Sequence, residues 1–312
     1  MLGEAALKRL AILNWSGHQN FGDELFNEAL RQLFKGWEVT VFSDSPKTIH
    51  PLIDFEAVNQ HDLFVLGGGE LINENRLFIP SPWVEKIKIP KIILGCGVNS
   101  DKASRIKPNV YRELQQFSYI GLRDTAAFSM LKSVPTLKEK VGLFYDLAFS
   151  IDSGEAWAPL GHNALVIPTD RFTNGADKGI QQFKLAKQSK KWLYKRLSGF
   201  DHVTFMPFGM EDNDDLNTCK SLSGFMENSD VLLPEQLSLP LVLETIRRSS
   251  CIYPYRLHGM VLSYILGAPF EFYPYHWKLN RVYNTIIGSQ PEAIKQTQRQ
   301  IVEGLLERLD LC

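Results

Sequence analysis

An arginine and a histidine stand two positions apart in CIYPYRLHGMVLSYILGAPF, residues 251–270. If CIYPY is a strand that stays extended past its carboxyl end, Arg256 and His258 face the same side. His258 would also stand at the start of the next helix, beside backbone N–H groups without a partner inside that helix. A guanidinium, N–H donors and an imidazole suit a phosphate or carboxylate whose neighbouring atom needs a proton. The alternative is a helix-capping histidine with a surface arginine, but the pair and its placement favour a functional role.

Three glycine-rich stretches follow other strand-like runs: NFGDE (20–24), LGGGELI (66–72) and GCGVNS (95–100). Glycine lets the backbone approach a ligand and exposes N–H donors to an anion. A tight strand-to-helix turn needs glycine whatever it binds, so each stretch alone is ambiguous. Three of them at equivalent strand ends favour a shared cleft. No G-x-G-x-x-G opens the first helix and no G-x-x-x-x-G-K-[ST] occurs, which disfavours a dinucleotide fold and a nucleotide hydrolase.

Three carboxylates belong to these stretches. Asp23 and Glu24 stand where the first helix is expected to begin, so either could cap it by accepting from its first N–H groups. Glu70 directly follows three glycines, and it could bind sugar hydroxyls, act as a base or merely face solvent. The residues assigned to an acceptor site or cleft wall are Asn20, Gly22, Asp23, Glu24, Gly67, Gly68, Gly69, Glu70 and Arg123.

Two further arginines could share an anion with Arg256. Arg171 follows the strand-like run ALVIP, at the corresponding edge of the second half of the chain. Arg123 ends YIGLR, and an arginine followed by an aspartate at a strand end is often a structural pair. We therefore favour a structural role for Arg123 over an anion-binding one.

The elements that would position these residues alternate along the chain. Strands are expected over 10–15, 39–42, 63–66, 91–95, 119–122, 164–168, 203–208, 251–255 and 270–275. Helices are expected over 22–34, 124–132, 179–197, 238–248 and 258–267, with a further helical stretch after 280 that covers the core. This alternation predicts parallel sheets with helices on both faces. The polar stretch 150–163 is interpreted as a linker, which divides the chain into α/β domains 1–152 and 153–312 facing across a cleft.

The composition is typical of a soluble globular protein, with 312 residues, 44% hydrophobic and 22% charged, and a formal net charge of −1. A nucleic-acid-binding protein usually carries a broad basic excess, so that class is disfavoured. No apolar run reaches the ~18 residues of a membrane-spanning helix, and the one near the N-terminus is too short for a signal peptide. The four cysteines have neither metal-ligand spacing nor the density of a disulfide framework, which indicates a reducing, cytoplasmic compartment.

One basic segment stands out from this balance. FKLAKQSKKWLYKRL, residues 183–197, contains six lysines or arginines. A solvated helix with long basic side chains is the default interpretation. The sharper alternative is contact with anionic lipid or an acidic glycan, which would place the protein peripherally at the inner face of the membrane.

Together these pieces resemble the polysaccharide pyruvyl transferase family. The matching segments, in chain order, are NFGDE, LGGGELI, GCGVNS, GLRDTAAFSML, FYDLAFSI, ALVIP with Arg171 beyond it, FMPFGMEDNDD and YRLHGMVLSYILGAPFEFYPYHWK. They extend from residue 10 to about 280. The last segment is the most specific, because arginine and histidine flank a leucine before an apolar helix, a Gly-x-Pro and a downstream lysine.

The resemblance implies two Rossmann-like parallel-sheet domains in a GT-B-like arrangement, with the acceptor on the N-terminal side and phosphoenolpyruvate on the C-terminal side. It implies transfer of a pyruvyl group from phosphoenolpyruvate to two hydroxyls of a sugar, as a ketal, in cell-surface polysaccharide biosynthesis. By position, Arg256 and His258 take donor-binding and catalytic places. Arg171 takes a second anion-binding place, and Gly259 and Lys278 are further donor-binding residues.

In this interpretation the His258 imidazolium protonates the vinyl carbon, and Asp23 or Glu70 assists as a base. Neither a metal nor a cofactor is required, and the saccharide acceptor could be lipid-linked. Two alternatives stay open. One is a glycosyltransferase whose arginines hold the pyrophosphate of a nucleotide-sugar, and the other is a non-catalytic saccharide-binding relative, against which the Arg-x-His pair argues.

Overall fold

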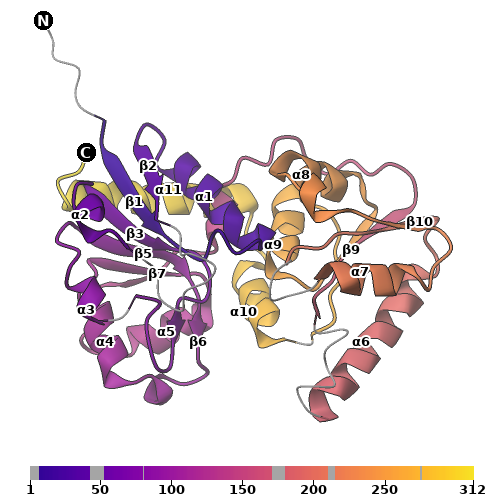
Figure 1. The fold of residues 1–312 in the computed structure, drawn as a ribbon, viewed down its shortest axis with the longest axis horizontal. Coiled ribbons are helices and arrows are strands. Elements are labelled where there is room, and N and C mark those ends of the chain that lie inside the picture. The colour runs from indigo at the N-terminus through magenta and orange to yellow at the C-terminus, as the bar shows by residue number, and fades with distance from the viewer. Residues whose placement is uncertain (1–6, 43–52, 80, 171–179, 210–214, 275) are drawn as a thin grey trace, which may run out of the picture. The chain divides into compact units, whose positions relative to one another are not determined.

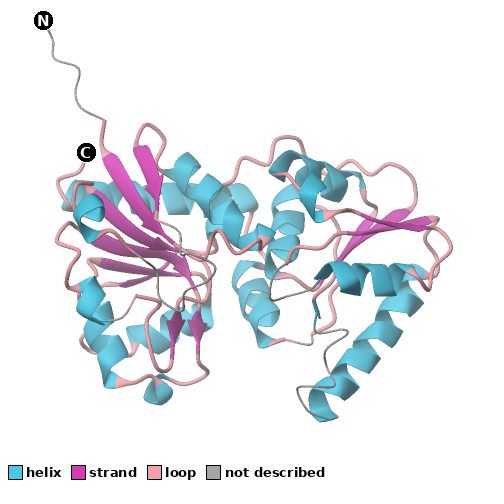
Figure 2. Ribbon diagram, viewed as in Figure 1, coloured by secondary structure: helices cyan, strands magenta, loops and turns pink. Residues whose placement is uncertain are grey.

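The computed structural model describes residues 7–42, 53–79, 81–170, 180–209, 215–274 and 276–312. They form two compact α/β units (Figures 1 and 2). The first unit holds the chain up to residue 18 together with residues 26–151 and 281–312. The second unit holds residues 19–25 and 152–280.

The described residues of the first unit form a six-stranded parallel sheet. Its strand order is β2 (Glu38–Val41), β1 (Arg9–Leu13), β3 (Leu63–Gly67), β5 (Lys91–Cys96), β7 (Tyr119–Leu122) and β8 (Val141–Leu143). A short pair, β4 (Ile72–Asn73) and β6 (Val98–Asn99), lies beside it. The helices of this unit are α2 (Phe55–Val58), α3 (Ser81–Val84), α4 (Pro108–Leu114), α5 (Thr125–Lys132), α11 (Pro291–Arg308) and α1 (Phe21–Leu33) from Phe26 onward. The strands are near-continuous apolar runs because helices cover both faces of the sheet.

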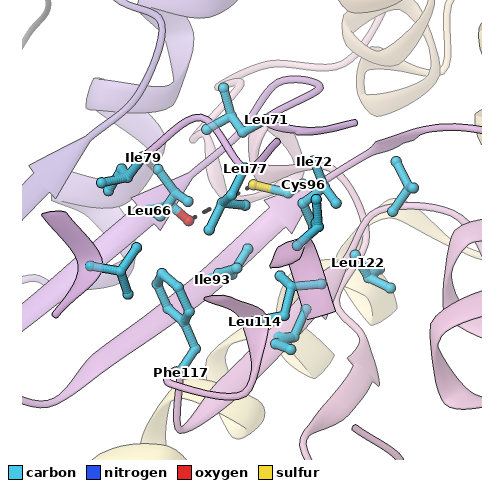
Figure 3. Close-up of a cluster of buried hydrophobic side chains, with 14 of the residues drawn as sticks. Leu66, Leu71, Ile72, Leu77, Ile79, Ile93, Cys96, Leu114, Phe117 and Leu122 are labelled. Carbon is cyan, nitrogen blue, oxygen red and sulfur yellow. Dashed lines mark hydrogen bonds between the residues drawn. The ribbon is translucent and has the colours of Figure 1, made fainter. Parts of the chain in front are cut away.

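One face of this sheet packs on α2, α3, α4 and α5, and α1 and α11 cover the other (Figure 1). Figure 3 shows part of the first layer, where Leu66, Ile93 and Leu122 of three neighbouring strands lie with Leu114 and Phe117. All five of these side chains are fully buried. Removing such apolar area from water contributes about 25 cal/mol per Å², so this layer anchors the strands whose carboxyl ends carry the candidate residues.

The described residues of the second unit form a four-stranded parallel sheet. Its order is β11 (Ser229–Val231), β10 (His202–Phe205), β9 (Asn163–Ile167) and β12 (Cys251–Pro254). Its helices are α6 (Ile180–Leu197), α7 (Asp215–Ser223), α8 (Leu239–Arg248) and α9 (Leu257–Leu266), and α10 (Trp277–Ile286) begins in it. Ala164, Val203 and Tyr253 of its strands share a core cluster with Leu193 of α6.

Both sheets have a topological switch point. In the first, the chain passes from β1 to β2 on one side and then to β3 on the other. In the second, β10 and β11 lie on one side of β9, and β12 lies on the other. Ligands of open α/β sheets bind outside the carboxyl ends of the two strands that flank such a point. Ligand binding is therefore expected at the carboxyl ends of β1 and β3 in the first sheet, and of β9 and β12 in the second.

The two units differ from the expected division after residue 152. The C-terminal helix α11 belongs to the first unit, because Gln298 donates from Nε2 to the carbonyl of Asp146 (2.9 Å) and accepts from Ser150 Oγ (2.8 Å). Residues 19–25 belong to the second unit. The backbone amide of Phe21 there donates to the carbonyl of Phe208 at 2.7 Å.

The run 270–275 was expected to be a strand, and within its described part this expectation is wrong. Phe270 makes an isolated parallel bridge to Ile252, and no further ladder is formed over residues 271–274. Pro269 and Pro274 have no N–H to donate to such a ladder, which limits its length.

Candidate functional site

Asp215, the first residue of α7, ties together three strand ends of the second unit. Its carboxylate accepts from the amide of Asp170 after β9 (2.9 Å) and from the amide of Gly209 after β10 (2.8 Å). It also accepts two bonds from Arg256 after β12, from Nε at 2.8 Å and from Nη2 at 2.5 Å. Asp215 is fully buried, and this burial raises the pKa of its carboxyl although the Arg256 charge opposes the shift.

The two hydrogen bonds to Asp215 fix the direction of the Arg256 guanidinium. Arg256 is the N-cap residue of α9, with φ −97° and ψ 136°, so the extended conformation continues to it and ends there. His258 is already helical, so the expectation that extended backbone places Arg256 and His258 on the same side is not met. Its Nη2 also lies 3.9 Å from Oδ1 of Asp170. The side chain keeps 18% of its surface exposed, whereas Asp215 keeps none. The buried Asp215 carboxylate fixes the direction of the guanidinium, and part of the guanidinium is exposed. This arrangement suits the binding of an anion.

His258 is the second residue of α9, and only 8% of it is exposed. Its ring lies against Gly22 in the first turn of α1, so that a Cβ on Gly22 would come within 2.0 Å of His258 Nδ1. The segment that carries Gly22 is held by the Phe21–Phe208 backbone bond and by an antiparallel bridge between Asn20 and Gly209. The structure therefore brings together Gly22 and His258, which the sequence had placed on separate domains.

The remaining donor-side residues have mixed outcomes. Arg171 lies outside the described residues. Gly259 packs α9 onto β9, because a Cβ there would meet Ile167 Cδ1 at 2.7 Å. Lys278, the second residue of α10, is half-buried, and its amide donates to Nδ1 of His276 at 3.2 Å. The donor-binding roles of these three residues stay predictions.

Asn20 caps α1, where Asp23 or Glu24 had been considered as the cap. The Asn20 side chain accepts from the Gly22 amide at 3.2 Å, and its carbonyl accepts from the amides of Asp23 (2.9 Å) and Glu24 (3.1 Å). Asp23 and Glu24 lie in the first helical turn, where their charges complement the positive end of the helix dipole. All four of these residues belong to the second unit, not to the acceptor-side domain in which we had placed them.

Arg123 occupies the carboxyl edge of the first sheet, directly after β7. Its Nη2 lies 3.2 Å from Oε1 of Glu70, and its Nη1 lies 3.8 Å from Oδ2 of Asp146. A Cβ on Gly97 would come within 2.8 Å of the guanidinium, so the backbone after β5 closes over it. Arg123 is only 2% exposed and Asp146 is fully buried, but Glu70 keeps 20% of its surface exposed.

These contacts support a structural role for Arg123. Its partners are Glu70 and Asp146, and not Asp124, the aspartate that follows it in the chain. Asp124 instead caps α5, where its side chain accepts from the Ala127 amide at 2.8 Å. Arg123 holds Glu70 in place, and Glu70 alone of the three charged groups reaches solvent appreciably.

Local packing and backbone angles account for the glycines before Glu70. Gly67 ends β3, and a Cβ there would meet Leu30 of α1 at 3.1 Å. Gly68 and Gly69 have φ values of +75° and +72°, a region that residues with a Cβ rarely adopt. A Cβ on Gly68 would also come within 2.2 Å of the Phe26 ring. These glycines let α1 approach the sheet closely and turn the chain so that Glu70 stands at the edge.

Cys96 at the end of β5 is not a nucleophile candidate. It is fully buried, its Sγ donates to the carbonyl of Gly68 at 3.4 Å, and burial raises its pKa to about 12. Since the thiolate is the reactive form, this thiol is unreactive near neutral pH. Among the residues that the structure describes, no group of three or more histidines, cysteines or carboxylates is arranged to hold a metal ion.

Sequence reasoning missed Asp215, Asp170 and Asp146. Asp215 ends the acidic run EDNDD and is the first residue of α7, and acidic residues are enriched in the first turn of a helix; this was the available signal. Asp170 follows β9 as Arg123 follows β7, at a strand end. Asp146 caps the short helix Leu147–Ser150 through the Ala148 amide at 3.0 Å.

Comparisons with known proteins concern the family and the fold of the chain. The sequence model of the family described as polysaccharide pyruvyl transferase matches residues 20–276. No curated protein matches the chain by sequence.

Solved structures show the fold. The chain is similar to the UDP complex of MnaA from S. aureus, with a TM-score of 0.58 and 11% identity over 98% of each chain. It is also similar to UDP-GlcNAc 2-epimerase from Methanocaldococcus jannaschii, with a TM-score of 0.52 and 12% identity over 96% of this chain and 99% of that one. The expected Rossmann-like α/β fold class is therefore confirmed. Because the family model covers most of its length, the chain belongs to the polysaccharide pyruvyl transferase family.

Proposed function

We propose that this protein transfers the pyruvyl group of phosphoenolpyruvate to two hydroxyls of a saccharide, forming a cyclic ketal in cell-surface polysaccharide synthesis. The observation that carries the proposal is the placement of Arg256 and His258 at the β9–β12 switch point, in a chain of this family. Phosphoenolpyruvate brings a phosphate and a carboxylate, and both anions call for charged donors such as a guanidinium fixed in direction.

In the proposed reaction His258, as the imidazolium, delivers a proton to the CH₂ carbon of phosphoenolpyruvate. The C=C π electrons form the new C–H bond, and positive charge develops on the carbon that bears the phosphate. The guanidinium of Arg256 holds the donor anion, so that this carbon stays within reach. The His258 ring packs against Gly22, so its direction toward a bound donor is fixed.

A sugar hydroxyl then attacks the cationic carbon and gives its proton to a base, for which Asp23, in the same unit as Arg256 and His258, is the candidate. The C–O bond to phosphate breaks, and its electron pair leaves with the phosphate. A neighbouring hydroxyl attacks the same carbon and closes the ketal. Its proton returns to the imidazole of His258, which restores the acid, and the proton on the base leaves with the phosphate. General acid–base help of this kind contributes about 10²–10⁴ in rate.

The donor assignment is tested by calorimetry with phosphoenolpyruvate on the wild type and on Arg256→Lys. Lysine keeps a positive charge beside Asp215 but lacks the planar fork, so the fold is retained while donor affinity falls. We expect binding by the wild type and at least a tenfold weaker Kd in the variant. UDP is the competing probe, because the S. aureus structure holds it. Tight UDP binding without phosphoenolpyruvate binding would instead favour a nucleotide-sugar enzyme.

We further propose that the acceptor is lipid-linked and that α6 contacts the membrane surface. Lys184, Lys187, Lys191 and Lys195 are exposed and recur every three or four residues, so they share one face of the helix. The helix contains no acidic residue that would offset their mutual repulsion. An anionic lipid surface would offset it, at about 1 kcal/mol per lysine. No described helix is apolar and long enough to cross a bilayer.

Vesicle flotation tests this contact. The double variant K187E/K191E should lose binding to phosphatidylglycerol vesicles, whereas K35E/K138E, which changes the net charge equally at exposed sites away from α6, should keep it. Equal flotation of both variants, or no flotation of the wild type, would exclude the α6 surface as a lipid contact.

A further inference from the structure

The end of β1 carries an aromatic platform that the proposed donor chemistry does not use. The Trp15 ring stacks on the His18 ring, with centroids 4.0 Å apart and an angle of 10° between the planes. The Phe78 ring meets Trp15 edge-on, with centroids 5.5 Å apart. Trp15 nevertheless keeps 37% of its surface exposed, which places it among the exposed large hydrophobic side chains of the described residues.

Two buried polar atoms lie in the same short segment. Among the described residues, neither Ser16 Oγ nor His18 Nε2 has a hydrogen-bond partner. The segment itself is fixed, because Asn14 accepts from the Ser16 amide (2.9 Å) and donates to Asn27 of α1 (2.8 Å). A buried donor or acceptor left unsatisfied costs about 1–3 kcal/mol, so such atoms mark a place where a ligand completes the bonding.

The platform lies where the topology predicts a ligand. β1 and β3 flank the switch point of the first sheet, and their carboxyl ends lead to Trp15 and to Glu70. Phe78 joins the two strand ends, because its amide donates to the carbonyl of Leu71 next to Glu70 (2.8 Å) while its ring contacts Trp15. The stacked ring and the arginine-held carboxylate therefore belong to one edge.

The charges at this edge indicate which ligand fits. Arg123 is enclosed and faces two carboxylates, Glu70 and Asp146, so this group does not attract a phosphate or a carboxylate. A neutral polyhydroxylated ring is the better match. One face of a pyranose presents C–H bonds that pack on the electron-rich face of an indole, and its rim presents hydroxyls that bond to carboxylate, hydroxyl and imidazole groups.

We propose that Trp15 is the stacking platform for a pyranose ring of the acceptor saccharide, with Ser16, His18 and Glu70 bonding its hydroxyls. The identification of this sugar as the acceptor rests on the proposed function. The stacking site itself requires only that a saccharide binds the first unit.

Saccharide binding without phosphoenolpyruvate tests the proposal. The probes are methyl glycosides of glucose, galactose and mannose and of their 2-acetamido forms, measured by saturation-transfer NMR and titration. We expect at least one glycoside to bind the wild type, Trp15→Ala to weaken that binding about tenfold or more, and Trp15→Phe to retain most of it. Trp37→Ala is the matched control, because Trp37 precedes β2 at the amino edge of the same sheet.

Unchanged glycoside binding by a folded Trp15→Ala, or an equal loss in Trp37→Ala, would overturn the assignment. It would also be overturned if no glycoside bound the wild type, or if uridine displaced the bound glycoside from Trp15. A different result would contradict the proposed function. If the protein binds glycosides through Trp15 but does not bind phosphoenolpyruvate, the saccharide site is supported and pyruvyl transfer is not.

Discussion

The two sheets carry the same pair of groups at their carboxyl edges, an arginine and a buried carboxylate, but they enclose the arginine to different degrees. Arg123 is 2% exposed and lies between Glu70 and Asp146 under the backbone of Gly97. Arg256 is 18% exposed, and its Nη2 lies 2.5 Å from Asp215 and 3.9 Å from Asp170. Both arginines therefore face two carboxylates, and they differ in their exposure. The first guanidinium is enclosed and holds Glu70 in place, whereas part of the second is exposed to solvent.

The two edges also differ in their neighbouring groups. Arg256 has a largely buried imidazole, His258, two residues away in the chain. The imidazole at the first edge, His18, is instead stacked on the partly exposed indole of Trp15 and is accompanied by the Glu70 carboxylate. An anion that must be protonated suits the second edge, and a neutral sugar suits the first. An arginine–carboxylate contact thus positions Glu70 in the first unit, and in the second unit it fixes the direction of a partly exposed guanidinium.

The largest effect should follow from removing the imidazole. We expect His258→Gln to lower kcat by about 10²–10⁴, with little change in phosphoenolpyruvate affinity, because the acid acts in the transition state. Phosphate release with a saccharide acceptor measures it. His202→Gln is the control, because His202 is exposed and pairs with Asp230. A variant at position 258 that turns over normally would remove the acid from the mechanism and leave the two edges alike.

The enclosed arginine should matter most for stability. Arg123→Met leaves two carboxylates without their cation, one of them fully buried, and we expect a loss of about 3–5 kcal/mol in the free energy of unfolding. Urea titration measures it, with Arg105→Met as the exposed control that should change stability by less than about 1 kcal/mol. Phosphoenolpyruvate affinity of the folded fraction should not change. If that affinity falls as in Arg256→Lys, the distinction between the two arginines is wrong.

Much of the fold could be predicted because both sheets are parallel and buried on both faces, so that their strands are apolar runs bounded by turns. The expected strands at 63–66 and 119–122 are β3 and β7 almost to the residue. β8 and β11 were missed, since each is three residues long and SDV in β11 is mostly polar. α11 was assigned to the wrong unit, because its packing depends on Gln298 finding Asp146, which no local pattern encodes.

Some residues of the candidate site could likewise be predicted from the sequence, and others could not. Arg256 and His258 could be found because a strand end and a helix start fall next to each other in the chain. Asp215 could not be paired with Arg256 by any spacing rule, since the two meet only when the ends of β10 and β12 lie along one sheet edge. The transfer of Gly22 to the second unit is likewise a tertiary event, visible only in its contact with His258.

A smaller effect on stability, which depends on pH, should distinguish the contribution of Arg256 from that of the Asp215 carboxylate. Burial raises the pKa of Asp215, so this group stabilises the fold when protonated, below its unfolded value of 3.8, and loses that contribution as the pH rises through the folded pKa. Arg256 opposes the shift. Arg256→Met should therefore raise this pKa further and cost about 2 kcal/mol at pH 7, with the loss shrinking toward pH 4.

Urea titrations between pH 4 and pH 7 measure that dependence, and R256M/D215N supplies the control. The double variant has no ionisable group at this position, so its stability relative to the wild type should no longer follow the pH in the same way. A single variant whose deficit is constant with pH would show that removing Arg256 does not change the pKa of Asp215, which would contradict the electrostatic coupling between the two groups.

The smallest effect tests the contact between the first helical turn and the imidazole. Alanine in a helix is usually more stable than glycine by about 0.5–1 kcal/mol, and Gly304→Ala in α11, with nothing within 4 Å of the new Cβ, should show that gain with unchanged turnover. Gly22→Ala should behave otherwise, because its Cβ would lie 2.0 Å from His258 Nδ1 and must displace the ring. Displacement of a catalytic group by about 1 Å costs up to about 10²-fold, and since the ring can tilt rather than shift, we expect roughly tenfold in kcat. If Gly22→Ala instead gains stability and keeps its kcat, as Gly304→Ala should, the position of the imidazole does not govern the rate, and the second edge binds its anion without acting on it.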